Sequence, residues 1–224
     1  MQNQTDEITW RDGGVPVSTR FDDPFFSLEN GVAETQHVFL EGNDLPARFG
    51  AEFHIAELGF GTGLNLLVAW DAWLRADMEG PLHFTSFEAF PMSSADMTRA
   101  HQSFPAFDGK REALAAAWQG KGGLIELPGL RAEVIEGDAR VTLPQWQGRA
   151  NAWFLDGFSP AKNPELWSSE LMLEVGSHTA PSGTAATYTA AGFVRRGLSA
   201  AGFEIERTTG YGRKRHMTRA RMLT

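Results

Sequence analysis

"HIAELGFGTGLNLLVAW", residues 54–70, joins three local patterns that together indicate the fold. An apolar run leads to glycines at positions 59, 61 and 63, and apolar residues then recur at helical spacing from Leu66 to Leu74. These patterns predict a strand, a tight loop and a helix that packs on a sheet. Several enzyme classes share this arrangement, so the loop alone leaves a dinucleotide, a phosphate group and another nucleoside cofactor open as ligands.

The chain from His54 onward alternates short β-rich runs with helical patterns. This alternation predicts an α/β fold, with a mostly parallel sheet and helices on both faces. Only the loop 208–214 separates the last two runs, which favours a hairpin and one antiparallel strand at or near the end of the sheet. The seven expected strands are residues 53–58, 82–90, 130–137, 151–157, 183–189, 203–207 and 215–221.

Residues 1–52 do not follow this alternation and carry turn signals at Asp12-Gly13-Gly14 and Asn30-Gly31. We expect them to form a small N-terminal extension, with a hairpin and a short helix, packed on a main domain of residues 53–224. Such an extension either covers the mouth of a cofactor site or only pads the sheet, and the sequence favours neither.

The composition is that of a globular protein, with 42% hydrophobic, 11% aromatic and 21% charged residues in 224. There is no cysteine, which excludes disulfides, thiolate metal ligands and a sulfur nucleophile. The N-terminus is polar and acidic, and no run approaches the roughly 18 apolar residues of a transmembrane helix. We therefore expect a cytoplasmic protein without a membrane partner.

Charge is distributed unevenly along the chain, whose net charge is -8. Residues 1–190 hold 12 basic and 26 acidic residues, whereas residues 191–224 hold 8 basic and 2 acidic ones. The overall charge argues against a general nucleic-acid binder. The basic C-terminal segment either meets phosphates locally or is only a solvated face.

The glycine loop lacks the features of two common phosphate sites. A dinucleotide fingerprint needs glycine three residues after its second glycine, and position 64 is leucine. No Gly-Lys-Ser/Thr follows, as a P-loop requires.

Four acidic residues instead lie at or near four successive strand ends: Glu57, Glu88, Asp138 and Asp156. In an open α/β sheet, ligands bind beyond the carboxyl ends of the strands. Glu88 is placed to accept hydrogen bonds from ribose hydroxyls, and Asp138 from an exocyclic amine of a base. Such acids repel a pyrophosphate and suit S-adenosylmethionine, although each acid alone is more often a turn former or helix cap.

Two other chemistries lack their motifs. The six histidines show no ligand pairing at three- or four-residue spacing, so we expect no metal site. No Gly-x-Ser-x-Gly elbow is present, which weakens a hydrolase interpretation.

Longer motifs carry a resemblance to a known family. They are "FDDPFFS", "GVAETQHVFLEGNDLPAR", "ELGFGTGLNLL", "NAWFLDGFSPAKNPELW", "TYTAAGFVRRGLSAAGF" and "GYGRKR". With these motifs, nearly the whole chain resembles the methyltransferase domain of the MnmC family, which modifies the wobble uridine of tRNA. "FLDGFSPAKNPELW" is the specific motif, whereas class I methyltransferases in general share the glycine loop. Ala89 departs from the family, where a charged residue is expected.

The resemblance implies a Rossmann-like class I methyltransferase fold that uses S-adenosylmethionine and leaves S-adenosylhomocysteine. It also implies methylation of the amine of 5-aminomethyl-2-thiouridine in tRNA, giving 5-methylaminomethyl-2-thiouridine. Bifunctional members carry an FAD-dependent oxidase domain that removes a carboxymethyl group beforehand. The chain has no such domain before Thr224, so we expect only the transfer step and no FAD. A separate oxidase, or other upstream tRNA-modification enzymes, would then prepare the substrate.

Candidate site residues follow from the loop, the strand ends and the resemblance. Asp156 is the candidate for orienting the amine and accepting its proton, the alternatives being a cap of the turn at Gly157 or a contact to the cofactor's amino group. Phe158 either stacks on the extruded uracil or packs in the core. The cofactor candidates are Glu57, Gly59, Phe60, Gly61, Thr62, Gly63, Asn65, Glu88, Asp138, Ala139 and Asp156. The substrate candidates are Phe158 and, for the tRNA backbone, Lys162, Arg195, Arg196, Arg213, Lys214 and Arg215, each with a solvated face as the alternative.

Two other functions compete with this hypothesis. An aminopropyltransferase of the same fold also needs acids at its strand ends, but a small polyamine gives no reason for the basic C-terminal segment. A non-catalytic RNA-binding module gives no reason for the four intact acids.

Overall fold

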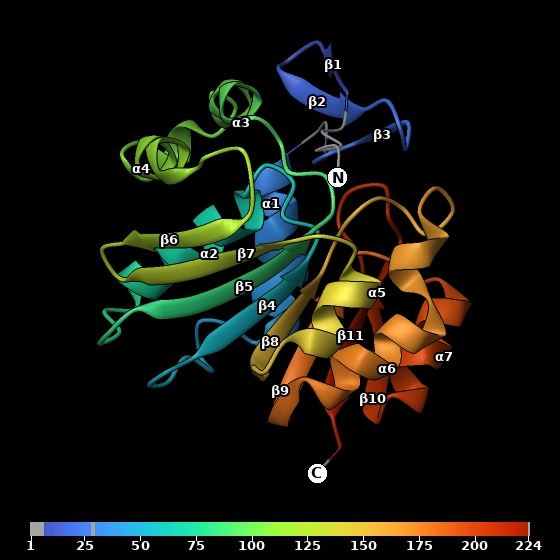
Figure 1. The fold of residues 1–224 in the computed structure, drawn as a ribbon. Helices are drawn as coiled ribbons and strands as arrows, with labels where there is room; N and C mark the ends of the chain where they lie inside the picture. Colours follow the sequence, from blue (N-terminus) through green and yellow to red (C-terminus); the bar gives the residue numbers. More distant parts are fainter. Residues whose placement is uncertain (1–6, 28–29, 224) are drawn as a thin grey trace.

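A computed structural model describes residues 7–27 and 30–223, so the expectations for residues 1–6, 28–29 and 224 lie outside the described residues. The described residues build one eight-stranded sheet in the order β10-β11-β9-β8-β4-β5-β7-β6 (Figure 1). Its strands are β4 (His54–Leu58), β5 (Leu82–Glu88), β6 (Gly123–Leu127), β7 (Leu130–Glu136), β8 (Ala150–Leu155), β9 (Thr179–Thr187), β10 (Phe203–Thr209) and β11 (His216–Met222).

All seven expected strands are present, and β6 is an eighth that the sequence analysis did not include. β11 is antiparallel to both of its neighbours, as the expected hairpin requires. β6 is antiparallel to β7 at the other edge, so the sheet has two antiparallel strands rather than one. The Pro128-Gly129 turn explains this hairpin, because Gly129 takes a φ of +71° between the paired residues Leu127 and Leu130.

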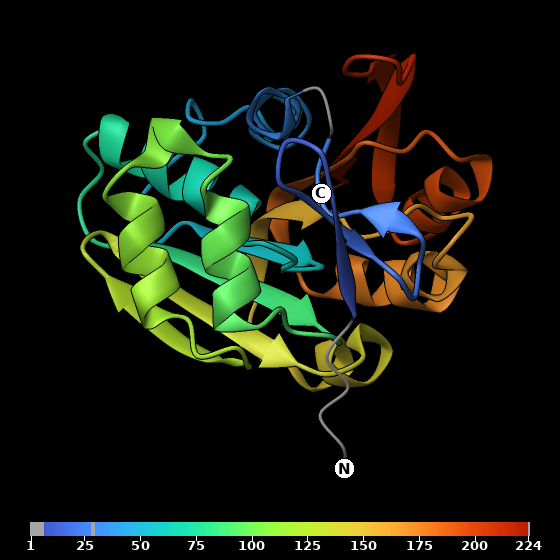
Figure 2. The same ribbon diagram turned by 90° about the horizontal axis from the view of Figure 1, so that it is seen from above.

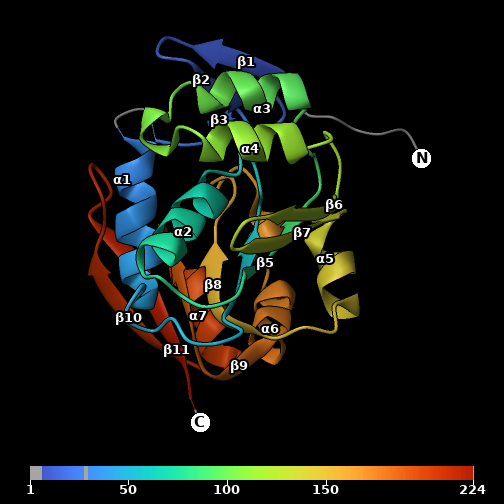
Figure 3. The same cartoon turned by 90° about the vertical axis from the view of Figure 1, so that its left-hand side faces the viewer.

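Helices cover both faces of the sheet, as the alternation predicts (Figures 1 and 3). Alternate residues of one strand serve opposite faces: Phe154 of β8 packs with α2, whereas Trp153 packs with α6 and α7. The first face carries α1 (Gly31–Thr35), α2 (Leu64–Arg75), α3 (Ser94–His101) and α4 (Lys110–Ala117), and the second α5 (Ala139–Thr142), α6 (Ser169–Ser177) and α7 (Gly192–Ala200).

The N-terminal residues form the expected hairpin and short helix. β1 (Ile8–Arg11), β2 (Val15–Ser18) and β3 (Asp23–Pro24) make a small antiparallel sheet, seen from above in Figure 2. α1 continues into the π-helical turn η1 (Gln36–Leu40), whose Phe39 stacks on Phe154 at 5.2 Å between ring centroids. The 3-10 turns are η2 (Glu41–Asn43), η3 (Pro105–Phe107), η4 (Leu143–Gln145) and η5 (Pro164–Trp167).

The parallel strands place their carboxyl ends along one edge of the sheet. β4, β5, β7, β8 and β9 run in the same direction, so the turns that follow them meet at that edge. No described helix is both long and apolar enough to span a membrane.

Candidate active site

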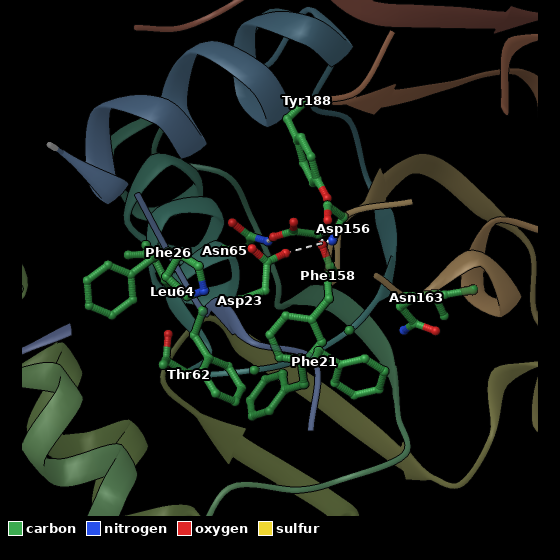
Figure 4. A pocket seen from close by; sticks show the side chains of 18 of the residues that line it. Phe21, Asp23, Phe26, Thr62, Leu64, Asn65, Asp156, Phe158, Asn163 and Tyr188 are labelled. Carbon is green, nitrogen blue, oxygen red and sulfur yellow. Dashed lines mark hydrogen bonds between the residues drawn. The ribbon is translucent and has the colours of Figure 1, made fainter. Parts of the chain in front are cut away.

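A cavity of about 890 Å³ opens where these strands end. Its walls come from the glycine turn after β4, from the ends of β5, β7 and β8, and from the N-terminal residues 20–27 (Figure 4). Elements far apart in the sequence therefore enclose one space at the position expected for a ligand of an α/β sheet.

The glycine turn brings backbone close to backbone at the base of the cavity. Gly59 has a φ of +85°, and a Cβ atom there would lie 3.1 Å from Cα of Gly157. The positive φ and the close approach to Gly157 both favour glycine at position 59. The Gly61 N–H donates to Glu88 Oε2 at 2.9 Å, which ties the turn to the end of β5.

Asn65, in the first turn of α2, joins two carboxylates. Its Nδ2 donates to Asp156 Oδ2 at 2.7 Å and to Glu57 Oε1 at 2.8 Å. The Asn65 carbonyl accepts from the Thr35 hydroxyl at 2.9 Å, and the Ser86 hydroxyl donates to Glu57 Oε2 at 2.6 Å. These partners fix which side of the amide faces the acids, so Asp156 is held in one orientation.

Burial shifts the acid–base behaviour of both carboxylates. It raises the pKa of Asp156 to about 6, against the hydrogen bonds from Asn65 and Gly157 that lower it. Burial also raises the pKa of Glu57 well above its ordinary value, although Ser86 and Asn65 oppose the shift. Asp156 can therefore exchange a proton near neutral pH, whereas Glu57 favours its neutral form.

Glu57 lies behind the wall of the cavity. Its side chain is fully buried, and Asn65 stands between it and the space. Glu57, expected to contact a ligand, does not line the cavity and instead accepts a hydrogen bond from Asn65. Nine other cofactor candidates do line the cavity: Gly59, Phe60, Gly61, Thr62, Asn65, Glu88, Asp138, Ala139 and Asp156. Gly63 precedes α2 as its N-cap and, like Glu57, is not among the lining residues.

The acids at the ends of β5 and β7 are each tied to the backbone. Glu88 Oε1 accepts from the Phe90 N–H at 2.8 Å, in addition to the bond from Gly61. Asp138 caps α5 by accepting from the Arg140 N–H at 2.9 Å. The Arg140 side chain also donates to Asp138, and this contact is the main cause of its lowered pKa. The helix-cap alternative is thus realised at Asp138, although its side chain also lines the cavity.

Aromatic rings form the wall beside Asp156. Phe158 stacks on Phe21 at 4.6 Å between ring centroids and meets the edge of Phe25 at 5.1 Å. Phe21 in turn lies 5.9 Å from Phe90. Phe158 therefore faces the cavity rather than the core, and its partners come from the N-terminal extension (Figure 4).

The cationic candidates differ in whether they line the cavity. Lys162 pairs with Asp22 at 3.0 Å, which makes it a link to the N-terminal residues. Arg213 and Lys214 line the cavity, and Lys214 turns toward Glu34. Arg195, Arg196 and Arg215 are not among the lining residues.

Several lining residues were absent from the expected set. They are Asp23, whose Oδ2 accepts from the Ser159 N–H at 2.8 Å, and Phe21, Phe25, Glu34 and Tyr188. The motifs "FDDPFFS", "GVAETQ" and "TYTAAGF" contain them, but no spacing rule indicates that these segments meet. Among the residues that the structure describes, no cluster of three or more His, Asp or Glu side chains could hold a metal ion.

Comparison with known proteins defines the class. A family model described as S-adenosyl-L-methionine-dependent methyltransferase matches residues 105–223, just over half of the chain. The chain belongs to this family of methyltransferases.

Solved structures show which methyltransferases the chain is similar to. The structure is similar to MnmC2 from Aquifex aeolicus, with a TM-score of 0.79 and 25% identity over 98% of this chain and 71% of that one. This match confirms the resemblance to an MnmC-type methyltransferase domain. DesVI of Streptomyces venezuelae (TM-score 0.51, 12% identity, 86% of this chain and 92% of that one) shares the fold. A precorrin-6y C5,15-methyltransferase of Geobacter metallireducens also shares the fold (TM-score 0.52, 12% identity, 94% of this chain and 93% of that one).

Proposed function

We propose that the protein methylates the side-chain amine of 5-aminomethyl-2-thiouridine at the wobble position of tRNA, giving 5-methylaminomethyl-2-thiouridine. The similarity to MnmC2 over 98% of the chain carries this proposal. The cavity supports it, since an aromatic wall for a base lies beside a carboxylate suited to an amine. The substrate already carries its aminomethyl group, so that group is installed before the methyl transfer.

The residues of the cavity fit S-adenosylmethionine, which supplies an electrophilic methyl group when bound. A Cβ atom at residue 59 would crowd the backbone of Gly157 at the base of the cavity, and Glu88 and Asp138 present carboxylates at adjacent strand ends. Carboxylate oxygens accept hydrogen bonds from hydroxyl and amino groups. We assign Gly59, Gly61, Asn65, Glu88 and Asp138 to cofactor binding, with Phe60, Thr62 and Ala139 as the surrounding wall.

We assign Asp156 the role of orienting the substrate amine and accepting its proton. An aliphatic ammonium must lose a proton before its nitrogen can attack, and a nearby carboxylate with a pKa of about 6 can accept that proton at neutral pH. Asn65 holds Asp156 through Oδ2, which leaves the carboxylate at the wall of the cavity. Orientation of the amine by this fixed group supplies much of the expected acceleration.

The N-terminal extension contributes to the same site. Residues 20, 21 and 23–27 line the cavity, and Phe21 and Phe25 pack on Phe158. We therefore assign residues 1–52 a covering role over the domain of residues 53–224, in preference to padding. The rings exclude water and offer a stacking surface for an extruded uracil.

One experiment tests the function against its rivals. The protein is incubated with labelled S-adenosylmethionine and tRNA that carries 5-aminomethyl-2-thiouridine, and the digested nucleosides are identified. Label in 5-methylaminomethyl-2-thiouridine is the expected result. A parallel incubation contains a polyamine in place of the tRNA, and label in that polyamine would indicate another amine substrate. Binding of tRNA and cofactor without any transfer would indicate a non-catalytic module, and either outcome contradicts the proposal.

A further inference from the structure

Lys214 is a cation of the substrate-facing loop that turns into the cavity. Its Nζ lies 2.8 Å from Glu34 Oε1 and 4.0 Å from the centre of the Tyr188 ring. Glu34 belongs to α1 and its side chain is only 13% exposed. An ammonium group of the chain itself is thus held between a carboxylate and an aromatic face.

These two contacts are the ones that recognise ammonium ions in general. A carboxylate gives a charge-assisted hydrogen bond, and the face of an aromatic ring attracts a cation within about 6 Å. The two groups come from α1 and from the residue after β9, so the tertiary fold, and not one local turn, builds this environment.

The same position borders the proposed proton acceptor. The Tyr188 hydroxyl donates to the carbonyl of Gly157, the residue after Asp156, at 2.9 Å. Figure 4 shows the hydroxyl end of Tyr188 directed toward Asp156. Glu34, Tyr188, Lys214 and Asp156 all line the one cavity.

Lys214 is suited to leave this position. It lies in the loop between β10 and β11, where its backbone N–H donates to the Tyr211 carbonyl at 3.0 Å. Its side chain is 46% exposed. Lysine carries its charge on a flexible stem, so the ammonium can move to solvent while the loop backbone stays in place.

We propose that Glu34 and the Tyr188 ring form an ammonium-binding subsite for the aminomethyl group of the substrate, and that Lys214 fills this subsite in the free protein. The inference rests on the proposed function and adds two positioning residues to it. The substrate ammonium replaces the Lys214 ammonium and then transfers one proton to the Asp156 carboxylate. An N–H bond breaks and an O–H bond forms, so the ion pair becomes a neutral amine and a carboxylic acid.

Direct binding tests this subsite without any methyl transfer. The protein is saturated with S-adenosylhomocysteine and titrated with 5-aminomethyluridine or with neutral 5-hydroxymethyluridine, and NMR titration gives both dissociation constants. The aminomethyl nucleoside is expected to bind about tenfold more tightly, the effect of one charge-assisted contact. Equal affinities, or no binding of either nucleoside, would overturn the inference.

Variants of the subsite should act in opposite directions. Glu34→Gln should abolish the preference for the aminomethyl nucleoside, whereas Lys214→Met should raise affinity for it by about threefold, because the internal competitor is gone. Tyr188→Phe should retain the preference and Tyr188→Leu should lose it. The matched controls Glu41→Gln and Lys121→Met change the same charges outside the cavity and should leave both constants unchanged.

The outcomes separate this inference from the proposed function. A preference that survives Glu34→Gln, or weaker aminomethyl binding in Lys214→Met, would contradict the subsite even if tRNA is methylated. A preference that follows the expected pattern in a protein that never methylates the tRNA would retain the subsite and contradict the function.

Discussion

Asn65 is the residue through which the two buried acids of the site act together. Its two amide hydrogens go to Glu57 and Asp156, and its oxygen accepts from Thr35, so its polar atoms are fully used. Replacing either acid changes the hydrogen-bond partners of Asn65. Substitution of either acid should therefore change both activity and stability.

Asp156→Asn should lower kcat for tRNA methylation by about 100-fold or more, because it removes the proton acceptor. Affinity for S-adenosylmethionine should change only a few-fold, since the Asn65 contact can persist with the new carbonyl. In the wild type, kcat/KM should fall as pH drops below about 6, where Asp156 becomes protonated. Rapid-quench transfer assays and calorimetry measure these quantities. Wild-type kcat in the variant would end the assignment.

Asp156→Asn should also stabilise the fold at neutral pH. The folded pKa is raised from 3.8 to about 6, so the ionised form destabilises the folded state as pH rises through that interval. At about 1.4 kcal/mol per pKa unit, the variant should gain up to about 3 kcal/mol above the interval and lose this gain below about pH 4. Urea unfolding at both pH values measures the difference. A gain independent of pH would contradict the buried charge as its cause.

Glu57 should tolerate an amide better than an apolar side chain. Glu57→Gln keeps a carbonyl that can accept from Asn65 or Ser86, and burial, which raises the pKa of Glu57, favours an uncharged side chain at this position. Glu57→Leu leaves both donors without their acceptor and should cost about 2 kcal/mol of unfolding free energy. Thermal melts together with kcat compare the variants. Equal loss in both would indicate that the carboxylate itself is required.

At the scale of elements, the sequence predicts the strands and the place of the site well. Period-two and helical patterns fix the order of β4, α2 and β5, and parallel strands must bring their ends together. Glu88, Asp138 and Asp156 are therefore found around one cavity as expected. Local patterns in the sequence determine these positions.

Side-chain direction and distant contacts could not be predicted in this way. Glu57 turns under Asn65, and Lys214 turns to Glu34 across 180 residues of chain. Tertiary packing decides both directions, and no periodicity in the sequence encodes it. The short strand β6 pairs with β7 in a hairpin, and the Pro-Gly turn between them is the only feature of the sequence that indicates this hairpin. The sequence patterns therefore did not predict β6.

Several contacts hold the N-terminal residues 20–27 over the cavity, among them the stack of Phe21 on Phe158 and the Ser159 N–H bond to Asp23. Phe21→Ala removes the 4.6 Å stack on Phe158, whereas the edge contact of Phe25 and the exposed Lys162–Asp22 pair, which contributes little alone, remain. Amides of residues 20–27 should then exchange faster with deuterium, and KM for tRNA should rise about tenfold, the effect of one aromatic pair. Phe193→Ala, an exposed ring of α7, is the matched control. Unchanged exchange in Phe21→Ala would contradict the covering role.

In the whole molecule, basic residues are concentrated toward one edge of the sheet. The last 34 residues carry 8 basic and 2 acidic residues, and they supply β10 and β11 at one end of the strand order. The loop between these strands reaches the cavity through Arg213 and Lys214. An acidic body with a basic edge at the cavity restricts how an RNA backbone can approach.

Arg213→Ala combined with Arg215→Ala should therefore weaken tRNA binding and reduce its salt dependence. Each lost phosphate contact lowers the slope of log K against log salt by roughly 0.7 to 0.9, so the pair should lower it by about 1.5. The control Lys121→Ala with Arg131→Ala removes the same charge at the opposite edge, beside β6 and β7. Equal slopes for the two double variants would show that net charge, and not the basic edge, attracts the RNA. A lower slope for the first alone places the tRNA backbone across the mouth of the cavity.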